Sequence, residues 1–152
     1  MNQAIVTRRY TFAGQHRLHT EALSEEENRR VFGKCNNPNG HGHNYTLFVT
    51  VGGPVEPETG RMAGIGDLDR LVEEAVVARF DHRDINRDPA FAERTTTGEN
   101  LVLLVWDLLV ARLPEGRLRK VGLIETRDNY FEYTGPGEAA DTSVAAIGPA
   151  RW

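Results

Sequence analysis

The stretch HNYTLFVTV, residues 43–51, alternates between two faces along its whole length. One face carries Tyr45, Leu47, Val49 and Val51, and three of the four intervening side chains are polar. Alternation with a period of two is typical of a β-strand with one buried face. We therefore place this strand in a sheet that is covered on one side by a hydrophobic core.

Further strands and helices are expected around this strand. Alternation and turn residues indicate strands over about residues 5–15, 118–126 and 129–134, with a return strand near residues 61–66. Helices are predicted over about residues 25–32, 67–78 and 97–112. A sheet with helices on one face makes a two-layer α+β unit. Such a small open sheet leaves strand edges exposed, which favours an oligomer.

Capping residues support the predicted starts of the helices. Ser24 and Glu27 have the spacing of a capping box ahead of the first helix. Asp67 is the expected N-cap of the second helix, and Thr96 with Glu99 forms the expected capping pair of the third.

Length and composition indicate an ordinary globular domain. The chain has 152 residues, of which 39% are hydrophobic and 26% charged, and we expect one domain over residues 1–135 with a poorly ordered C-terminal tail over 136–152. The net charge of −4 offers nucleic acid or an anionic membrane no general attraction, and no apolar run approaches the roughly 18 residues of a membrane helix. Residues 1–9 lack the apolar segment of a secretory signal, and the single cysteine cannot form an internal disulfide. A cytoplasmic location is therefore expected.

Three histidines lie where the first two strands would meet. His41 and His43 are two residues apart at the start of a strand, so their side chains point to the same face. His16 ends the first strand, and antiparallel pairing would bring it next to them. Three neutral imidazoles with an open fourth position suit catalytic zinc. The alternative is that this Gly/Asn-rich loop simply carries surface histidines.

Cys35 lies six residues before His41 and admits three interpretations. It could complete a closed Cys-His₃ zinc site of the structural type, stay off the metal as a nucleophile or base, or be a buried inert thiol. A neighbouring zinc ion or imidazole would lower the pKa of the thiol. Its Gly, Lys, Asn and Pro neighbours indicate a loop, and spacing alone leaves these choices open.

Two acidic groups are candidates for catalysis or binding. Asp81 adjoins His82, and a carboxylate beside an imidazole could orient the ring or raise its basicity. Glu125 follows an apolar strand segment, where it would need a donor-rich partner such as the amino-pyrimidine edge of a pterin or guanine. Alternatively, Glu125 faces solvent or pairs with Arg127 or Lys120.

Several longer runs of sequence resemble one enzyme family. They are TFAGQHRL (11–18), LSEEEN (23–28), FGKCNNPNGHGHNY (32–45), DH (81–82), TGEN (97–100) and IET (124–126). The run that leads from Cys35 to His43 is long and specific, and the match extends over about residues 10–135. On these residues the chain resembles the 6-pyruvoyl-tetrahydropterin synthase family.

The resemblance implies a tunnelling fold. In this fold a four-stranded antiparallel sheet carries two long helices on one face. Subunits join their sheets into a barrel as trimers, and two trimers stack as a homohexamer. The resemblance also implies zinc as cofactor, with magnesium at the triphosphate left open, and a pterin triphosphate as the small-molecule partner.

The site residues follow from the resemblance, position by position. The implied set consists of the zinc ligands His16, His41 and His43, the catalytic residues Cys35, Asp81, His82 and Glu125, and the substrate-binding residues Thr97, Glu99 and Glu125. Cys35 would stay free of the metal as the catalytic base. Asp81 and His82 would complete a proton relay across a subunit boundary, while Glu125 would anchor the pterin ring and take part in the relay.

The implied reaction is that of a lyase of tetrahydrobiopterin biosynthesis. It converts 7,8-dihydroneopterin triphosphate to 6-pyruvoyl-tetrahydropterin with elimination of triphosphate. A second branch, the 6-carboxytetrahydropterin synthases of queuosine biosynthesis, typically has a shorter segment between the cysteine and the first histidine. Here that segment has five residues, which favours the pyruvoyl branch. Candidate cations for the triphosphate are Arg8, Arg9, Arg17 and Lys34.

Two other classes of function share the same residues. A non-catalytic pterin- or zinc-binding module would keep the scaffold, although binding alone needs no thiol base. A zinc hydrolase using a bound hydroxide would not depend on Cys35.

Overall fold

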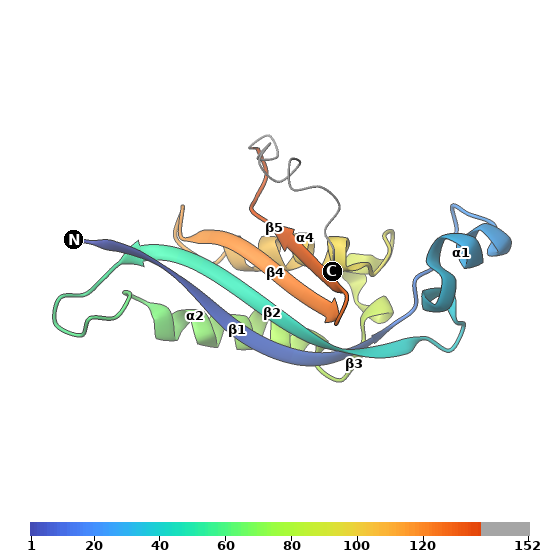
Figure 1. Ribbon diagram of the computed structural model, residues 1–152, viewed down its shortest axis with the longest axis horizontal. Helices are drawn as coiled ribbons and strands as arrows, with labels where there is room; N and C mark the ends of the chain where they lie inside the picture. Colours follow the sequence, from blue (N-terminus) through green and yellow to red (C-terminus); the bar gives the residue numbers. More distant parts are fainter. Residues whose placement is uncertain (138–152) are drawn as a thin grey trace.

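The computed structural model describes residues 1–137 and contains a long twisted sheet with helices packed on one side (Figure 1). The elements in chain order are β1 (Gln3–His16), α1 (Glu25–Phe32), the 3₁₀ turn η1 (Gly33–Asn36), β2 (His41–Pro54), α2 (Ile65–Val72), the π-helical segment η2 (Glu73–Val77), α3 (Ala78–Phe80), β3 (Arg83–Asp84), the 3₁₀ turns η3 (Ile85–Arg87) and η4 (Pro89–Phe91), α4 (Gly98–Val110), β4 (Leu118–Thr126) and β5 (Asn129–Tyr133). The predicted α+β class is confirmed. In the expected C-terminal tail, residues 138–152 lie outside the described part of the chain, and the domain limit at residue 135 stays a prediction. No helix within residues 1–137 is long and apolar enough to cross a membrane.

The sheet has five strands in the order β3-β1-β2-β4-β5. β1 and β2 pair antiparallel over their full length, from Gln3 opposite Pro54 to His16 opposite His41. The predicted four-stranded, purely antiparallel sheet is wrong, because β3 adds a fifth strand that runs parallel to β1 at its outer edge. β3 has only two residues, so no alternating pattern could have indicated it.

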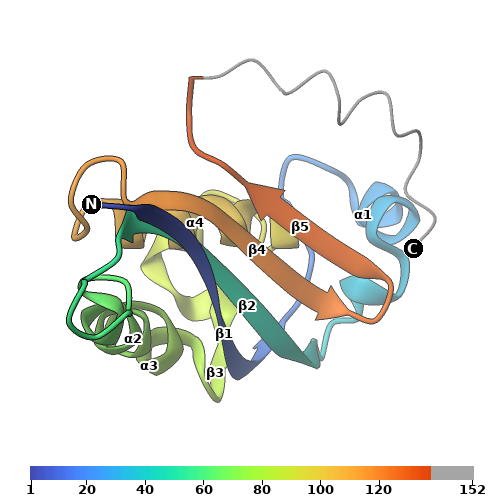
Figure 2. The ribbon, with the colours of Figure 1, turned by 60° about the vertical axis from the view of Figure 1, so that its left-hand side comes forward.

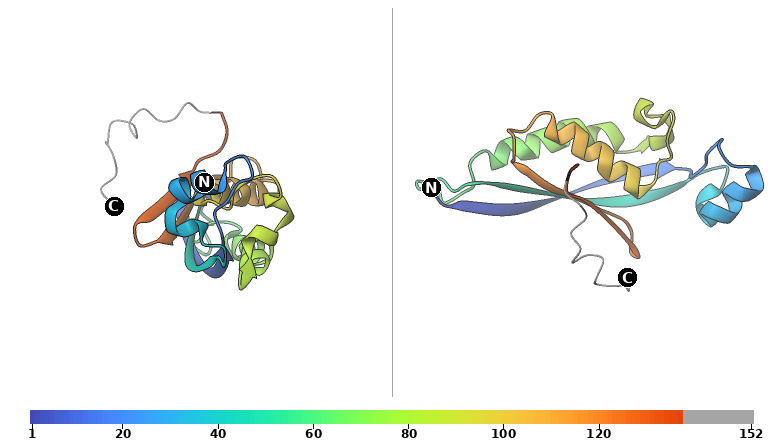
Figure 3. Two further views of the ribbon diagram at one scale, coloured as in Figure 1. Left: turned by 90° about the vertical axis from the view of Figure 1, so that its right-hand side faces the viewer. Right: turned by 90° about the horizontal axis from the view of Figure 1, so that it is seen from above.

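The helices α2, α3 and α4 cover one face of the sheet, as the view from above in Figure 3 shows. The apolar stripe of residues 43–51 faces them, and Tyr45, Leu47 and Val49 are fully buried. The fully buried helix residues opposite are Val72, Val76, Phe80, Leu101, Val105 and Leu109. α1 stands apart at the end of the β1–β2 ribbon, beyond this core (Figure 1, Figure 2). The polar ends of β1 and β2 therefore lie between the core and α1.

The second predicted helix and the return strand need correction. α2 begins directly after Gly64, whose left-handed φ of 76° turns the chain into the helix, so that Asp67 lies in the first turn and not at the cap. The strand expected near residues 61–66 is wrong for a similar reason, since the chain there already bends toward α2. A single isolated bridge, between Val55 and Met62, takes its place.

The starts of the other two helices are close to the prediction. Ser24 and Glu27 form both hydrogen bonds of the capping box at the start of α1. Thr97, and not Thr96, is the N-cap of α4, because its hydroxyl accepts a hydrogen bond from the amide three residues later at 3.2 Å. α4 ends at Val110. Thr96 is buried instead, and its carbonyl faces the histidines described below.

Candidate metal centre and active site

Three histidine side chains meet where β1 ends and β2 begins. In the β1–β2 register His16 stands opposite His41, and Gly14 stands opposite His43. Residues two apart in a strand share a face, so all three imidazoles point to the helix-covered side. Each offers one nitrogen, and these nitrogens lie within 4.8 Å of one another. The structure thus brings together the three histidines that the sequence singled out, and His16 is only 1% exposed.

A backbone carbonyl fixes the tautomer of His16. Its Nδ1 lies 2.8 Å from the carbonyl oxygen of Thr96, and since a carbonyl only accepts, Nδ1 carries the proton. The other nitrogen, Nε2, keeps its lone pair and lies 3.1 Å from Nε2 of His41. Burial lowers the pKa of His16 to about 4 and also lowers the pKa of His41 and His43. All three rings are therefore neutral at pH 7, which is the form that binds metal.

This donor set fits a divalent metal ion. Nε2 of His43 is buried without a hydrogen-bond partner among the described residues, which is unfavourable unless another group binds there. Two nitrogens bound to one tetrahedral zinc ion at ~2.0–2.1 Å lie about 3.3 Å apart. The 3.1 Å between His16 and His41 is close to that separation. Three nitrogen donors with a fourth position open is the pattern of a catalytic zinc site.

Cys35 lies in η1 and is not a member of the converging group. Its carbonyl accepts a hydrogen bond from the Leu18 amide at 2.8 Å, which ties η1 to the segment that follows β1. Burial raises the pKa of the thiol, and the negative charge of Glu125 raises it further. The neutral imidazoles supply no positive charge, so they do not lower the pKa of the thiol as the sequence suggested. Within residues 1–137 the closed Cys-His₃ arrangement is not formed.

Glu125 lies near the end of β4, on the same face as the histidines. It is 7% exposed, and its Oε1 is 3.7 Å from Nε2 of His43. Burial raises the pKa of Glu125 to about 7, with the charge of Glu99 as the second cause. The alternative of a solvent-facing Glu125 is wrong, and Lys120 and Arg127 pair with other carboxylates. A buried ionised carboxylate needs hydrogen-bond donors, and a bound ligand could supply them to Glu125.

The start of α4 borders the same space. The hydroxyl of Thr97 caps the helix, and Glu99 lies in its first turn. The charge of Glu99 raises the pKa of Glu125 further, after the larger effect of burial. Thr97 and Glu99 are two of the three residues that the resemblance assigned to substrate binding, and they lie at the start of α4, just after Thr96, whose carbonyl contacts His16.

Two groups at the site were missed by sequence reasoning. The carbonyl of Thr96 has no side-chain signature and could not be found from sequence. Tyr45 is fully buried, its hydroxyl has no partner among the described residues, and its ring centre lies 5.6 Å from that of His43. Its place in the apolar stripe of residues 43–51 predicts a core residue, although its position two residues after His43 puts it on the same face as the histidines.

Asp81 and His82 lie at the outer edge of β1. An oxygen of Asp81 accepts a hydrogen bond from the Ala13 amide at 2.9 Å and lies 3.3 Å from Nδ1 of His82. His82 has a left-handed backbone, with φ of 57°, and its side chain is 80% exposed. Among residues 1–137 their hydrogen bonds and ion pairs link them to each other, to β1 and to the Val77 carbonyl, and not to Cys35. His82 and His43 line one pocket at the end of β1, but within residues 1–137 no hydrogen bond joins Asp81 or His82 to the three histidines.

Comparisons with known proteins agree on a group of pterin enzymes. The family profile described as 6-pyruvoyl tetrahydropterin synthase matches residues 5–136. The human protein named 6-pyruvoyl tetrahydrobiopterin synthase is 47% identical over 134 residues, which cover 88% of this chain and 92% of the human one. The protein of the same name from Drosophila melanogaster is 43% identical over 135 residues, covering 88% and 80% of the two chains. The solved structure of Caenorhabditis elegans 6-pyruvoyl tetrahydropterin synthase superposes with a TM-score of 0.82 at 36% identity, covering 89% of this chain and 97% of that one.

Proposed function

This chain belongs to the 6-pyruvoyl tetrahydropterin synthase family, and we propose that it converts 7,8-dihydroneopterin triphosphate to 6-pyruvoyl-tetrahydropterin with elimination of triphosphate. The names of the relatives support this product over the 6-carboxytetrahydropterin of the other branch. The observation that carries the proposal is the convergence of three neutral imidazoles next to a buried carboxylate, Glu125.

His16, His41 and His43 would hold the metal ion. The family is metal-dependent, and three nitrogen donors favour zinc over magnesium, which prefers oxygen ligands. When bound, zinc would act as a Lewis acid on the oxygens of the substrate side chain. The contact between His16 and the Thr96 carbonyl orients the first ligand before any metal binds. An assay with and without added magnesium tests for a second ion at the triphosphate.

Cys35 is the proposed catalytic base. Its sulfur would accept the proton from the side-chain carbon of the substrate, and a positioned base of this kind is worth ~10²–10⁴-fold in rate. The thiol must ionise to do so, and burial in the metal-free chain opposes this. A positive charge held by the three histidines would lower the pKa of the thiol.

Glu125 is the proposed anchor of the pterin ring. The amino-pyrimidine edge carries adjacent N–H groups that match the two oxygens of a carboxylate. Such donors would stabilise the ionised form of Glu125, whose pKa is raised to about 7 in the free chain. Thr97 and Glu99 would line the same pocket from the start of α4.

The proposed assembly is a homohexamer in which the sheets of three subunits join into a barrel and two trimers stack. β3 covers only two residues of the outer edge of β1, and β5 is the last strand on the other side of the sheet. Such edges are natural places for a further subunit. A neighbouring subunit would also bring Asp81 and His82 to Cys35 for the proton relay. We propose the cytoplasm as the location, because it keeps the thiol of Cys35 reduced.

Turnover of the substrate tests the proposal directly. Zinc-loaded protein incubated with dihydroneopterin triphosphate should release triphosphate and form 6-pyruvoyl-tetrahydropterin, identified by mass spectrometry. Cys35→Ala should abolish turnover and retain the metal. A product smaller by two carbons would assign the carboxy branch, and silence of the zinc-loaded protein would favour a non-catalytic binding module. Full activity of Cys35→Ala would indicate a hydrolase, and loss of its zinc would indicate a closed Cys-His₃ site.

A further inference from the structure

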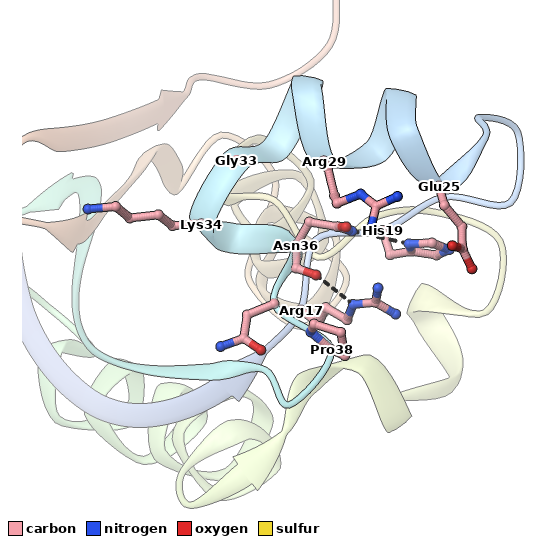
Figure 4. Close-up of a pocket in the computed structure, with 9 residues that line it drawn as sticks. Arg17, His19, Glu25, Arg29, Gly33, Lys34, Asn36 and Pro38 are labelled. Atoms are coloured by element: carbon pink, nitrogen blue, oxygen red, sulfur yellow. Dashed lines mark hydrogen bonds between the residues drawn. The ribbon is translucent and has the colours of Figure 1, made fainter.

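A pocket of about 590 Å³ lies between α1 and the loop that leads into β2 (Figure 4). Its walls come from the segment after β1, from α1 and from residues 33–38. The charged side chains that line it are Arg17, Glu25, Arg29 and Lys34. Three cations against one carboxylate leave the pocket positive, in a chain whose net charge is −4.

Two of these cations face the hollow together. Figure 4 shows the guanidinium groups of Arg17 and Arg29 on the same side of η1, whereas Lys34 extends away from them. Nε of Arg17 donates a hydrogen bond to the Asn36 carbonyl at 3.0 Å, which holds the side chain in place and leaves its two terminal nitrogens available. No ion pair within residues 1–137 involves Arg17 or Arg29.

The other candidate cations are less suited to bind an anion. Nε and Nη2 of Arg8 already donate hydrogen bonds to the two carboxylate oxygens of Asp69, at 3.1 and 2.6 Å. Arg9 lies opposite Phe48 in the middle of the β1–β2 ribbon. With a rise of about 3.3 Å per residue, that position is on the order of 20 Å from the end of β1.

The pocket adjoins the histidine site through neighbouring residues. Arg17 directly follows the candidate metal ligand His16, and Asn36 directly follows Cys35. Consecutive Cα atoms are about 3.8 Å apart, so the two sites share these stretches of backbone. A ligand that occupies the histidine site and carries a flexible anionic arm could extend that arm into the pocket.

We infer that this pocket binds the triphosphate of the substrate, with Arg17 and Arg29 as its paired ligands. The inference rests on the proposed function. A guanidinium group binds phosphate through two parallel hydrogen bonds. Two guanidinium groups would offset much of the negative charge of the triphosphate, which a protein of net charge −4 would otherwise repel. A free phosphate chain has the same chemistry, so the experiment must separate that source from the substrate.

Binding measured without turnover tests the inference. In the background of Cys35→Ala with zinc loaded, isothermal titration would use three ligands: dihydroneopterin triphosphate, dihydroneopterin without phosphate, and inorganic triphosphate. Arg29→Ala should weaken binding of both triphosphates by about tenfold, which corresponds to 1.4 kcal/mol, and leave dihydroneopterin unchanged. Arg30→Ala, which removes an exposed arginine from the same helix outside the pocket, is the matched control and should change none of the three. Arg17→Lys keeps the positive charge but loses the two parallel N–H donors of the guanidinium group, and should weaken triphosphate binding less than Arg29→Ala does.

The outcomes separate the pocket from the reaction. Equal affinity of Arg29→Ala and the background protein for dihydroneopterin triphosphate would overturn the inference. A loss for inorganic triphosphate alone would also overturn it, because the pocket would then serve a free anion. If the protein with Cys35 intact forms no product but Arg29 still determines the affinity for dihydroneopterin triphosphate, the subsite stands and the proposed reaction fails.

Discussion

The proton on Nδ1 of His16 points to the carbonyl oxygen of Thr96, 2.8 Å away, although 80 residues separate the two in sequence. This contact couples the end of β1 to the residue just before the N-cap of α4. It leaves Nε2 of His16 as the only lone pair on that ring, aimed at His41. The packing of α4 on the sheet therefore determines which nitrogen of His16 can bind a metal ion.

Removing this histidine should remove the metal. Loss of a residue that only supports a metal ligand weakens metal binding by ~10–100-fold. His16→Ala removes a ligand itself, so we expect it to weaken zinc binding by at least this factor. Zinc content after dialysis against a competing chelator, measured by mass spectrometry, checks this. His19→Ala is the control, because His19 lies three residues away but outside the converging group. A stoichiometric zinc content in His16→Ala would contradict the assignment of this ligand.

The buried carboxyl of Glu125 should make the metal-free protein less stable in mild alkali. Its pKa is raised from 4.5 to about 7, so the folded state favours the protonated acid. The protonated acid contributes fully to the free energy of unfolding below pH 4.5, and this contribution is lost as the pH rises through about 7. Glu125→Gln mimics the protonated acid and should add on the order of 1–3 kcal/mol at pH 8 but little at pH 4. Urea unfolding in EDTA at both pH values measures this, and an equal effect at the two would refute it.

The pair of Arg79 and Asp88 should have the opposite pH dependence. Both oxygens of Asp88 accept hydrogen bonds from Arg79 at 2.7 Å, and this pairing lowers the pKa of Asp88 below 3.8. Its contribution is therefore present above about pH 4 and is lost as the pH falls through the lowered pKa. Asp88→Asn should cost about 2–4 kcal/mol at pH 7 and progressively less toward pH 3. Asp128→Asn, in an exposed pair with Arg127, should stay within about 0.5 kcal/mol at either pH.

Asn28 should hold the loop before α1 in place. Its side chain is fully buried, accepts a hydrogen bond from the Thr20 amide at 2.9 Å and donates to three carbonyls of residues 20–24. Asn28→Ala removes the partners of the Thr20 amide and the Leu23 carbonyl, whereas the Thr20 and Ser24 carbonyls keep their backbone hydrogen bonds. It should lower the free energy of unfolding by about 1–3 kcal/mol. Thermal unfolding would detect the loss, and Glu26→Ala on the exposed side of α1 should have little effect. A melting temperature equal to that of the parent protein would show that water replaces the amide.

The sequence predicted the parts of the fold that have a strong local pattern. The alternation in β2 and the capping box of α1 are local signals, and the structure has both elements close to the predicted bounds. β3 and the early start of α2 were missed, because a two-residue strand and a left-handed Gly64 depend on how the chain packs and not on periodicity. The shift of the α4 cap from Thr96 to Thr97 has the same origin, since two adjacent threonines offer equivalent caps.

The candidate site was predictable where it depends on strand pairing. Antiparallel pairing of two adjacent strands brings His16 next to His41, and this follows from sequence order alone. The burial of Glu125 depends on which face of β4 meets the core, and sequence reasoning left that open. The exposed position of His82 depends on packing at the edge of β1, which no short motif encodes.

The unbroken pairing of β1 with β2 restricts how this chain can change during evolution. An extra residue in the loop between η1 and β2 would lengthen a turn and leave the strands aligned. The same insertion between His43 and Tyr45 would rotate every later side chain of β2 to the opposite face, because the side-chain period of a strand is two. Descendants of this protein can therefore tolerate insertions in the loop. A one-residue shift of register inside the strand would both expose the core and separate the three imidazoles.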